Sequence, residues 1–221
     1  MRNAEIEAAI LAAPDDPSAY LVYADWLQGH GEPRGELITL QHAMRQHNDI
    51  EEFARFRKHE EVLRNQHAAA WLGEEVASSL HRTYFEWRLG FVDAARLDAP
   101  RDELVPLGEG DATNPYAITR TAEPSLPALV TGLLASPCGW LVRTFTLRGP
   151  LDQVRVAMAA LPSRTLRRLV LVPSTEVLDA TRLLAPEIMR MLNANVDVEL
   201  TVRGATEKFS WVRPTPSKRR T

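Results

Sequence analysis

The 221-residue chain contains a single cysteine, Cys138, which excludes an internal disulfide. It also lacks an apolar run of the roughly 20 residues that a membrane-spanning helix requires. The apolar patch at residues 8–13 ends at Pro14 and follows an acidic start, which is unlike a secretory signal peptide. Because one cysteine and no export signal suit a reducing compartment, we expect a cytoplasmic protein that does not enter the membrane.

Several patterns typical of enzymes are missing as well. The chain has no Gly-x-Ser-x-Gly, no phosphate-binding Gly-Lys loop and no Gly-x-Gly-x-x-Gly. His59-Glu60 begins like the helix motif of zinc proteases, but Leu63 occupies the position of the second ligand. No spacing links Cys138 to a His and Asn pair, so we expect a small buried residue there. The sequence therefore predicts no catalytic residue, no metal and no cofactor.

Net charge is only -3, and its distribution is uneven. Residues 1–82 hold 8 Lys or Arg and 14 Asp or Glu, whereas the remainder holds 18 and 15. Neither part shows the strong basic excess that dedicated nucleic-acid binders carry. The exception is residues 213–221, which carry four positive charges and no acid, including Lys218, Arg219 and Arg220. Two prolines oppose regular structure there, so we predict a basic disordered tail.

The spacing of the apolar residues changes near the middle of the chain. Up to about residue 82 these residues recur at helical intervals. Capping residues and glycines mark where each helix begins and ends. The predicted helices cover residues 4–13, 18–28, 33–46, 50–71 and 74–81. The first 82 residues thus predict a compact bundle of four or five helices.

After that point, short β-rich runs alternate with helical stretches. Strands are predicted over residues 87–97, 141–147, 166–172 and 196–202, with 208–212 as an edge strand. Helices are predicted over residues 126–135, 151–161 and 175–192. Residues 98–124 contain four prolines and two glycines and are interpreted as an irregular loop. Strand–helix–strand connections of this length require parallel strands.

The last apolar positions of three strands suggest a repeat. Leu147, Leu171 and Leu200 are 24 and 29 residues apart, within the period of leucine-rich repeats. Units of this kind bury their apolar face by stacking on one another. The usual Asn or Cys three residues further on is replaced, by Pro150, Ser174 and Arg203. We therefore predict a short, degenerate stack, with a small α/β layer carrying helices on one face as the alternative.

Together, these patterns predict an α+β or α/β chain. An N-terminal helical bundle, residues 1–82, caps a short leucine-rich-repeat-like stack with a parallel sheet, residues 83–212. Residues 98–124 interrupt the second part, and residues 213–221 follow it.

Two segments resemble one family. The first contains residues 10–16 (ILAAPDD), 21–27 (LVYADWL) and 31–38 (GEPRGELI), and the second contains residues 67–72 (HAAAWL) and 87–92 (WRLGFV). These strings resemble the bacterial repeat-companion domain and its link to the first repeat strand. The resemblance covers about a third of the chain. It implies a fold and an interaction role, without catalytic residues.

The predicted role is a non-catalytic, cytoplasmic protein–protein interaction or scaffold module. The helical bundle would shield one end of the stack, and the exposed sheet face or residues 98–124 would meet a protein partner. The partner's identity and the oligomeric state stay open. The candidate interaction surface consists of Arg143, Arg148, Arg167, Arg168, Lys218, Arg219 and Arg220.

Two alternatives remain. A nucleic-acid-binding accessory protein would use the basic tail and the strand arginines, and its affinity would fall steeply with salt. The acidic character of residues 1–82 counts against it. An enzyme with an unrecognised site would need polar groups that converge in a pocket.

Two further sets of residues carry structural expectations. Asp25 lies within an apolar helical stretch, where a buried carboxylate needs a partner such as Arg34 or a free N–H group at a helix start. A catalytic or ligand-binding acid is the alternative. Trp26, Trp71 and Trp87 are expected to pack in the core or where the helices meet the sheet, with an aromatic cage as the alternative.

Overall fold

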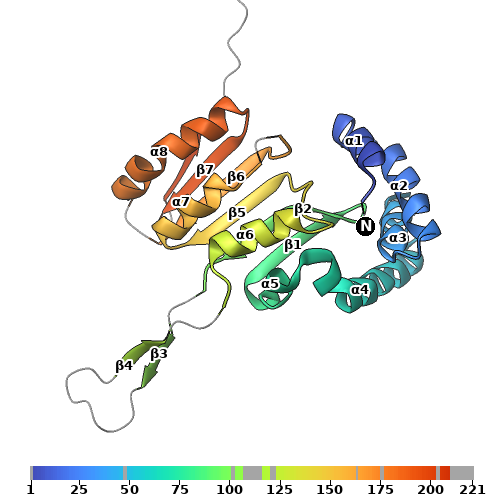
Figure 1. The fold of residues 1–221 in the computed structure, drawn as a ribbon, viewed down its shortest axis with the longest axis horizontal. Helices are drawn as coiled ribbons and strands as arrows, with labels where there is room; N and C mark the ends of the chain where they lie inside the picture. Colours follow the sequence, from blue (N-terminus) through green and yellow to red (C-terminus); the bar gives the residue numbers. More distant parts are fainter. Residues whose placement is uncertain are drawn as a thin grey trace, which may run out of the picture.

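A computed structural model describes residues 2–46, 49–100, 103–106, 116–119, 123–162, 164–174, 177–202 and 205–209. Within these ranges the chain forms eight α-helices and a six-stranded, mostly parallel sheet of order β1-β2-β5-β6-β7-β8 (Figure 1). The predicted α+β class is confirmed. None of the helices in these ranges combines the length and the apolarity needed to cross a bilayer.

Five α-helices precede the sheet, as predicted. Asn3 caps the first by accepting backbone N–H groups of Glu5 and Ile6, and Asp49 caps the fourth in the same way. Gly73, with φ of 87°, ends the fourth helix. The helix predicted over residues 74–81 ends early, at Ala77, and a 3-10 turn follows it at Leu80–Arg82. The elements are α1 (Ala4–Ala12), α2 (Ser18–Gly29), α3 (Arg34–Gln46), α4 (Ile50–Leu72), α5 (Glu74–Ala77) and the 3-10 turn η1 (Leu80–Arg82).

The strand predicted over residues 87–97 is confirmed from Phe91 onward, but its first part is wrong because the chain turns back at Leu89 and Gly90. β1 (Thr83–Arg88) and β2 (Phe91–Asp98) form an antiparallel hairpin around Leu89 and Gly90. Both turn residues have positive φ, 48° and 75°. Two central residues with positive φ are typical of the two-residue hairpin turn whose twist matches that of the flanking strands. Leucine rarely adopts a positive φ, so the residue type at position 89 does not predict a turn.

The centre of the sheet is parallel. β2 pairs with β5 (Thr144–Gly149), β5 with β6 (Arg168–Pro173), and β6 with β7 (Asp197–Val202). The antiparallel strand β8 (Ala205–Phe209) forms the far edge.

The register of these strands aligns the leucines that the sequence singled out. Leu147 lies opposite Leu171, and Leu171 lies opposite Leu200, which confirms the predicted parallel layer. Leu97 of β2 extends the row on the other side of Leu147. We call these four side chains the leucine row; all are buried.

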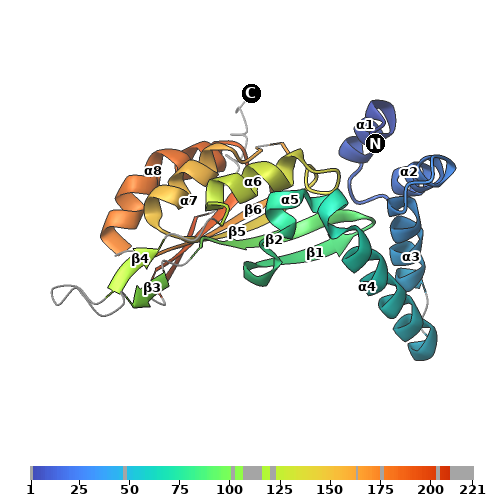
Figure 2. The same cartoon turned by 60° about the horizontal axis from the view of Figure 1, so that its bottom comes forward.

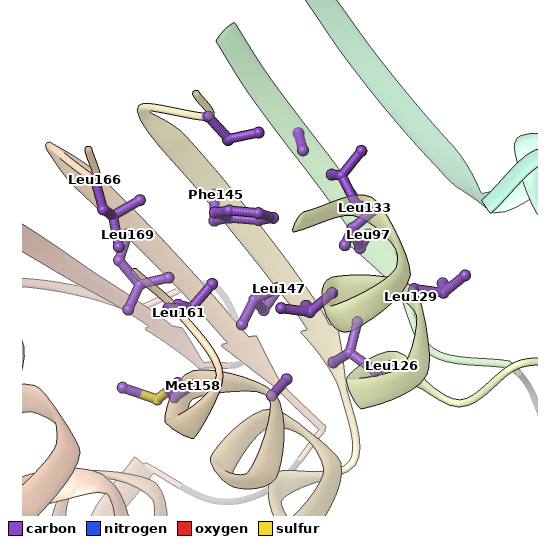
Figure 3. Close-up of a cluster of buried hydrophobic side chains, with 14 of the residues drawn as sticks. Leu97, Leu126, Leu129, Leu133, Phe145, Leu147, Met158, Leu161, Leu166 and Leu169 are labelled. Carbon is purple, nitrogen blue, oxygen red and sulfur yellow. The ribbon is translucent and has the colours of Figure 1, made fainter. Parts of the chain in front are cut away.

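Three helices lie on one face of the sheet (Figure 2): α6 (Leu126–Ala135), α7 (Leu151–Ala159) and α8 (Val177–Asn193). The leucine row belongs to the same buried cluster as side chains of these helices. Figure 3 shows side chains of α6, including Leu129 and Leu133, gathered over β2 and β5. Burying each large aliphatic side chain contributes about 1.5–3 kcal/mol. This layer is therefore the principal source of stability in the sheet.

The helical bundle shares its core with the sheet. Trp71, Leu72 and Val76 belong to the same buried cluster as the leucine row. A second cluster joins α1–α3 to the end of the hairpin, where Tyr23 meets Phe91. Packing is therefore continuous across residue 82, the sequence boundary between bundle and sheet.

The segment interpreted as an irregular loop contains a small hairpin. Within residues 98–124, β3 (Glu103–Pro106) and β4 (Tyr116–Thr119) pair antiparallel as a separate sheet. Most of the rest of that segment, and the tail at 213–221, lie outside the described residues.

Candidate binding surface

The sheet face opposite α6–α8 is the first candidate surface. Side chains along a strand alternate between the two faces, so burial of the leucine row turns the intervening residues the other way. These residues are half-buried or exposed, and among the described elements no helix lies over them (Figure 2). We call this surface the open face; it carries Arg96, Asp98, Thr144, Thr146, Arg148, Arg168, Val170, Val172, Asp197, Glu199 and Thr201.

Two of the predicted arginines, Arg148 and Arg168, lie on the open face. Arg168 Nη2 is 2.7 Å from Glu199 Oε2, and Arg148 Nη1 is 3.9 Å from Asp98 Oδ2. Half of each arginine side chain is exposed. Exposed ion pairs contribute only about 0–1 kcal/mol, so both guanidinium groups are free to exchange these carboxylates for those of a partner.

Arg143 occupies a different place. It precedes β5, and its Nε lies 2.6 Å from Asp93 Oδ1 while its Nη1 lies 2.7 Å from Asp15 Oδ1. Asp93 is free for this contact because the β1–β2 register shifts beside it. Arg88 Nη1 also approaches Asp15, at 3.2 Å. Arg143 therefore ties the α1–α2 connection to the sheet.

These contacts shift the ionisation of both partners. The hydrogen bond from Arg143 lowers the pKa of Asp15, assisted by the charges of Arg143, Arg88 and Arg167. The hydrogen bond with Asp93 raises the pKa of Arg143 above its ordinary value.

Arg167 also lies outside the open face. It is exposed just before β6, and its backbone N–H donates to the carbonyl of Arg143. The structure thus divides the predicted surface in two, with Arg148 and Arg168 on the face and Arg143 and Arg167 at the amino ends of the strands. Lys218, Arg219 and Arg220 lie outside the described residues.

A groove of about 440 Å³ lies between α3, α4 and β1, and sequence reasoning missed it. Arginines supply much of its polar lining, and aromatic side chains supply most of its apolar lining. Burial lowers the pKa of Arg45; the charges of Arg88 and Arg143 add to this effect, and the charge of Asp93 opposes it. The charged side chains of the groove are Arg45, Arg57, Glu60, Arg64, Glu86 and Arg88.

The tryptophans pack as expected. Trp71 is buried, its ring centroid lies 6.3 Å from that of Trp87, and its Nε1 donates to Glu32 Oε1 at 3.1 Å. Trp26 stacks instead on Tyr23, with centroids 5.8 Å apart. The packing interpretation is confirmed, and the three rings do not form one cage.

The expectation for Asp25 is wrong. The buried stripe of α2 consists of Tyr20, Tyr23, Ala24 and Leu27, which recur at helical spacing, and Asp25 falls outside it in solvent. Arg34, its expected partner, is buried elsewhere.

Arg34 instead joins the bundle to the segment after α6. Its Nη2 donates to the Tyr23 hydroxyl at 3.2 Å, and its Nη1 donates to the carbonyl of Pro137. Its guanidinium also lies over the rings of Tyr23 and Phe91, at 5.3 and 5.4 Å. It is therefore a structural residue of the shared core.

Two observations concern metal binding and nucleophilic side chains. No group of three or more potential metal ligands occurs among them. Cys138 is buried, and burial raises the pKa of its thiol to about 12. A thiol that stays protonated at neutral pH is a poor nucleophile.

No protein-family model matches this chain, and no similar curated protein or solved structure was found. The resemblance to the repeat-companion domain stays a prediction. The inference about function rests on the open face and the groove.

Proposed function

We propose that this protein is a non-catalytic protein–protein interaction module that receives its partner on the open face. The observation that carries the proposal is the asymmetry of the sheet. Parallel sheets are almost always covered on both faces. Here four parallel strands have helices on one face only, as far as the described elements extend. Stacked repeat proteins use uncovered sheet surfaces of this kind to bind macromolecules.

The composition of the open face supports a protein partner. Thr146, Val170 and Val172 are half-buried, and Arg148 and Arg168 flank them. Protein interfaces combine a less polar centre with a charged rim in the same way. Arginine is enriched at such interfaces because its planar group binds carboxylates through two parallel hydrogen bonds.

The charge of the open face favours protein over nucleic acid. Its arginines, Arg96, Arg148 and Arg168, are matched by Asp98, Asp197 and Glu199. A nucleic-acid surface needs a basic excess to neutralise phosphates. We propose a cytoplasmic location because the single cysteine suits a reducing compartment.

Site-specific photo-crosslinking in the native cell tests the proposal. A benzoylphenylalanine at Thr146 or Thr201 on the open face is expected to capture the same protein, identified by mass spectrometry. The matched control is Val156, an exposed apolar residue of α7 on the helical side. Capture of RNA from Thr146 and Thr201, or equal capture from Val156, would contradict the proposal.

A further inference from the structure

The groove runs along an unpaired strand edge. Among the described strands, β1 is at the edge of the sheet and pairs with β2 alone. Among the described residues, Thr83 N–H donates to the carbonyl of Leu80 in η1, whereas Tyr84–Arg88 form backbone hydrogen bonds with β2 alone. The groove is lined continuously by Tyr84–Leu89. An exposed edge of this kind offers alternating N–H and C=O groups to another extended chain.

The opposite wall of the groove is basic. Arg45 from α3 and Arg57 from α4 line it, and within the described part of the chain neither forms an ion pair or a side-chain hydrogen bond. The two acidic side chains of the groove, Glu60 and Glu86, differ in whether they have partners. Glu60 is engaged, accepting from Gln41 Nε2 at 2.8 Å and lying 3.5 Å from Arg64 Nε, whereas Glu86 is exposed on β1.

Exposed aromatic side chains also line the groove, beside its arginines. Phe53 is 39% exposed and Tyr84 is 54% exposed, although both are large and apolar enough to favour burial. Trp87 is half-buried beneath the guanidinium of Arg64, which lies 6.0 Å from its ring centroid. Exposed aromatic rings beside arginines are typical of protein-binding surfaces.

We propose that this groove binds an extended, acidic segment of a partner protein, which adds to the edge of β1 as a further strand. Backbone hydrogen bonds to β1 would supply affinity, and alternate side chains would supply specificity. Successive side chains of an added strand point in opposite directions. The side chains that point toward α3 and α4 would be acidic and would meet Arg45 and Arg57, with Phe53 one helical turn from Arg57 beside them, and the intervening side chains would point the other way.

Other occupants fit less well. The chain's own tail, residues 213–221, is basic and would be repelled by Arg45 and Arg57. A second copy pairing through β1 would bring these arginines close to their own counterparts. A nucleic acid offers no backbone N–H and C=O pattern that matches a strand edge. Charge and backbone chemistry together favour an acidic peptide.

Fluorescence anisotropy with the full chain tests this inference. The probe is a fluorescein-labelled peptide of alternating glutamate and valine. We expect saturable binding, little binding of the matching lysine and valine peptide, and loss of binding when the peptide's alternate backbone amides are N-methylated. N-methylation keeps the charge and removes the strand hydrogen bonds. Equal binding of the methylated peptide, or no saturable binding of the unmodified one, would overturn the inference.

A matched pair of variants locates the site. Arg57→Glu is expected to weaken binding by about tenfold or more, since a charge-assisted hydrogen bond is lost and a repulsion is introduced. Arg55→Glu makes the same charge change on α4 outside the groove and is expected to leave affinity unchanged. Equal weakening by both variants, or tighter binding of oligouridylate than of the peptide, would contradict an acidic-peptide site.

Hydrogen exchange supplies a second readout. Bound peptide is expected to slow amide exchange in Thr83–Arg88, and unchanged exchange there would exclude strand addition. The inference does not depend on the open face. Arg148→Glu is expected to leave peptide binding intact. The peptide assay therefore tests the groove proposal separately from the proposed function of the open face.

Discussion

Leu147 and Leu171 lie directly opposite each other on neighbouring parallel strands, and both are fully buried. Removing one methine and two methyl carbons from the centre of this row leaves a cavity that the surrounding strands and helices cannot fill. We therefore expect Leu171→Ala to lower the free energy of unfolding by about 2–5 kcal/mol, measured by urea denaturation. Thr146→Ala on the open face is the control, with an expected change within about 0.5 kcal/mol.

Arg34 provides a second test, at the junction of bundle and sheet. Arg34→Met removes the hydrogen bonds to Tyr23 and Pro137 and leaves the half-buried carbonyl of Pro137 without this donor. We expect a loss of about 2–4 kcal/mol in unfolding free energy. Arg34→Lys keeps the charge but loses the planar stacking, so it should also destabilise. A neutral outcome for both would contradict the role assigned to this residue.

The turn between β1 and β2 requires glycine at its second position. Gly90 has φ of 75°, and a Cβ there would overlap Ile38 of α3. Gly90→Ala is expected to destabilise by about 1–3 kcal/mol through backbone strain and overpacking. Gly29→Ala is the matched control, because nothing lies within 4 Å of the added carbon. Thermal unfolding of the two variants should separate them clearly, with Gly29→Ala at or above the wild-type midpoint.

The contact between Asp15 and Arg143 predicts a pH dependence. The folded protein lowers the pKa of Asp15, so this contact stabilises the fold above the ordinary carboxyl pKa. The contribution is lost as the pH falls through the lowered value. Asp15→Asn should therefore unfold at a slightly lower temperature than wild type at neutral pH, and the difference should shrink in acid. Because Asp15 is 80% exposed, the effect is small and should weaken with salt. A difference that grows in acid would contradict this account.

The parallel centre of the sheet was predictable because its signal is local. Leu147, Leu171 and Leu200 recur at a repeat-like interval, and the helices between them permit only a crossover connection. The hairpin was not predictable, since Leu89 adopts a backbone conformation that its residue type disfavours. Gly90 is compatible with a turn at this position, but a single glycine inside an apolar run indicates a bulge equally well.

The division of the arginines could not be read from the sequence. Arg143 and Arg148 differ because one precedes β5 and the other lies within it, and strand boundaries are the least certain part of such predictions. The groove was hidden for a related reason. Helical spacing places Arg57 on the surface of α4, but only tertiary packing shows that this surface faces the edge of β1.

The most direct measurement of the interaction function uses the protein captured from Thr146. Its dissociation constant would be determined by calorimetry for wild type, Arg148→Glu/Arg168→Glu and the control Arg155→Glu on the exposed side of α7. The account predicts that the double variant binds at least about tenfold more weakly, while the control binds like wild type. Unchanged affinity of the double variant would contradict the assignment of the open face as the binding surface.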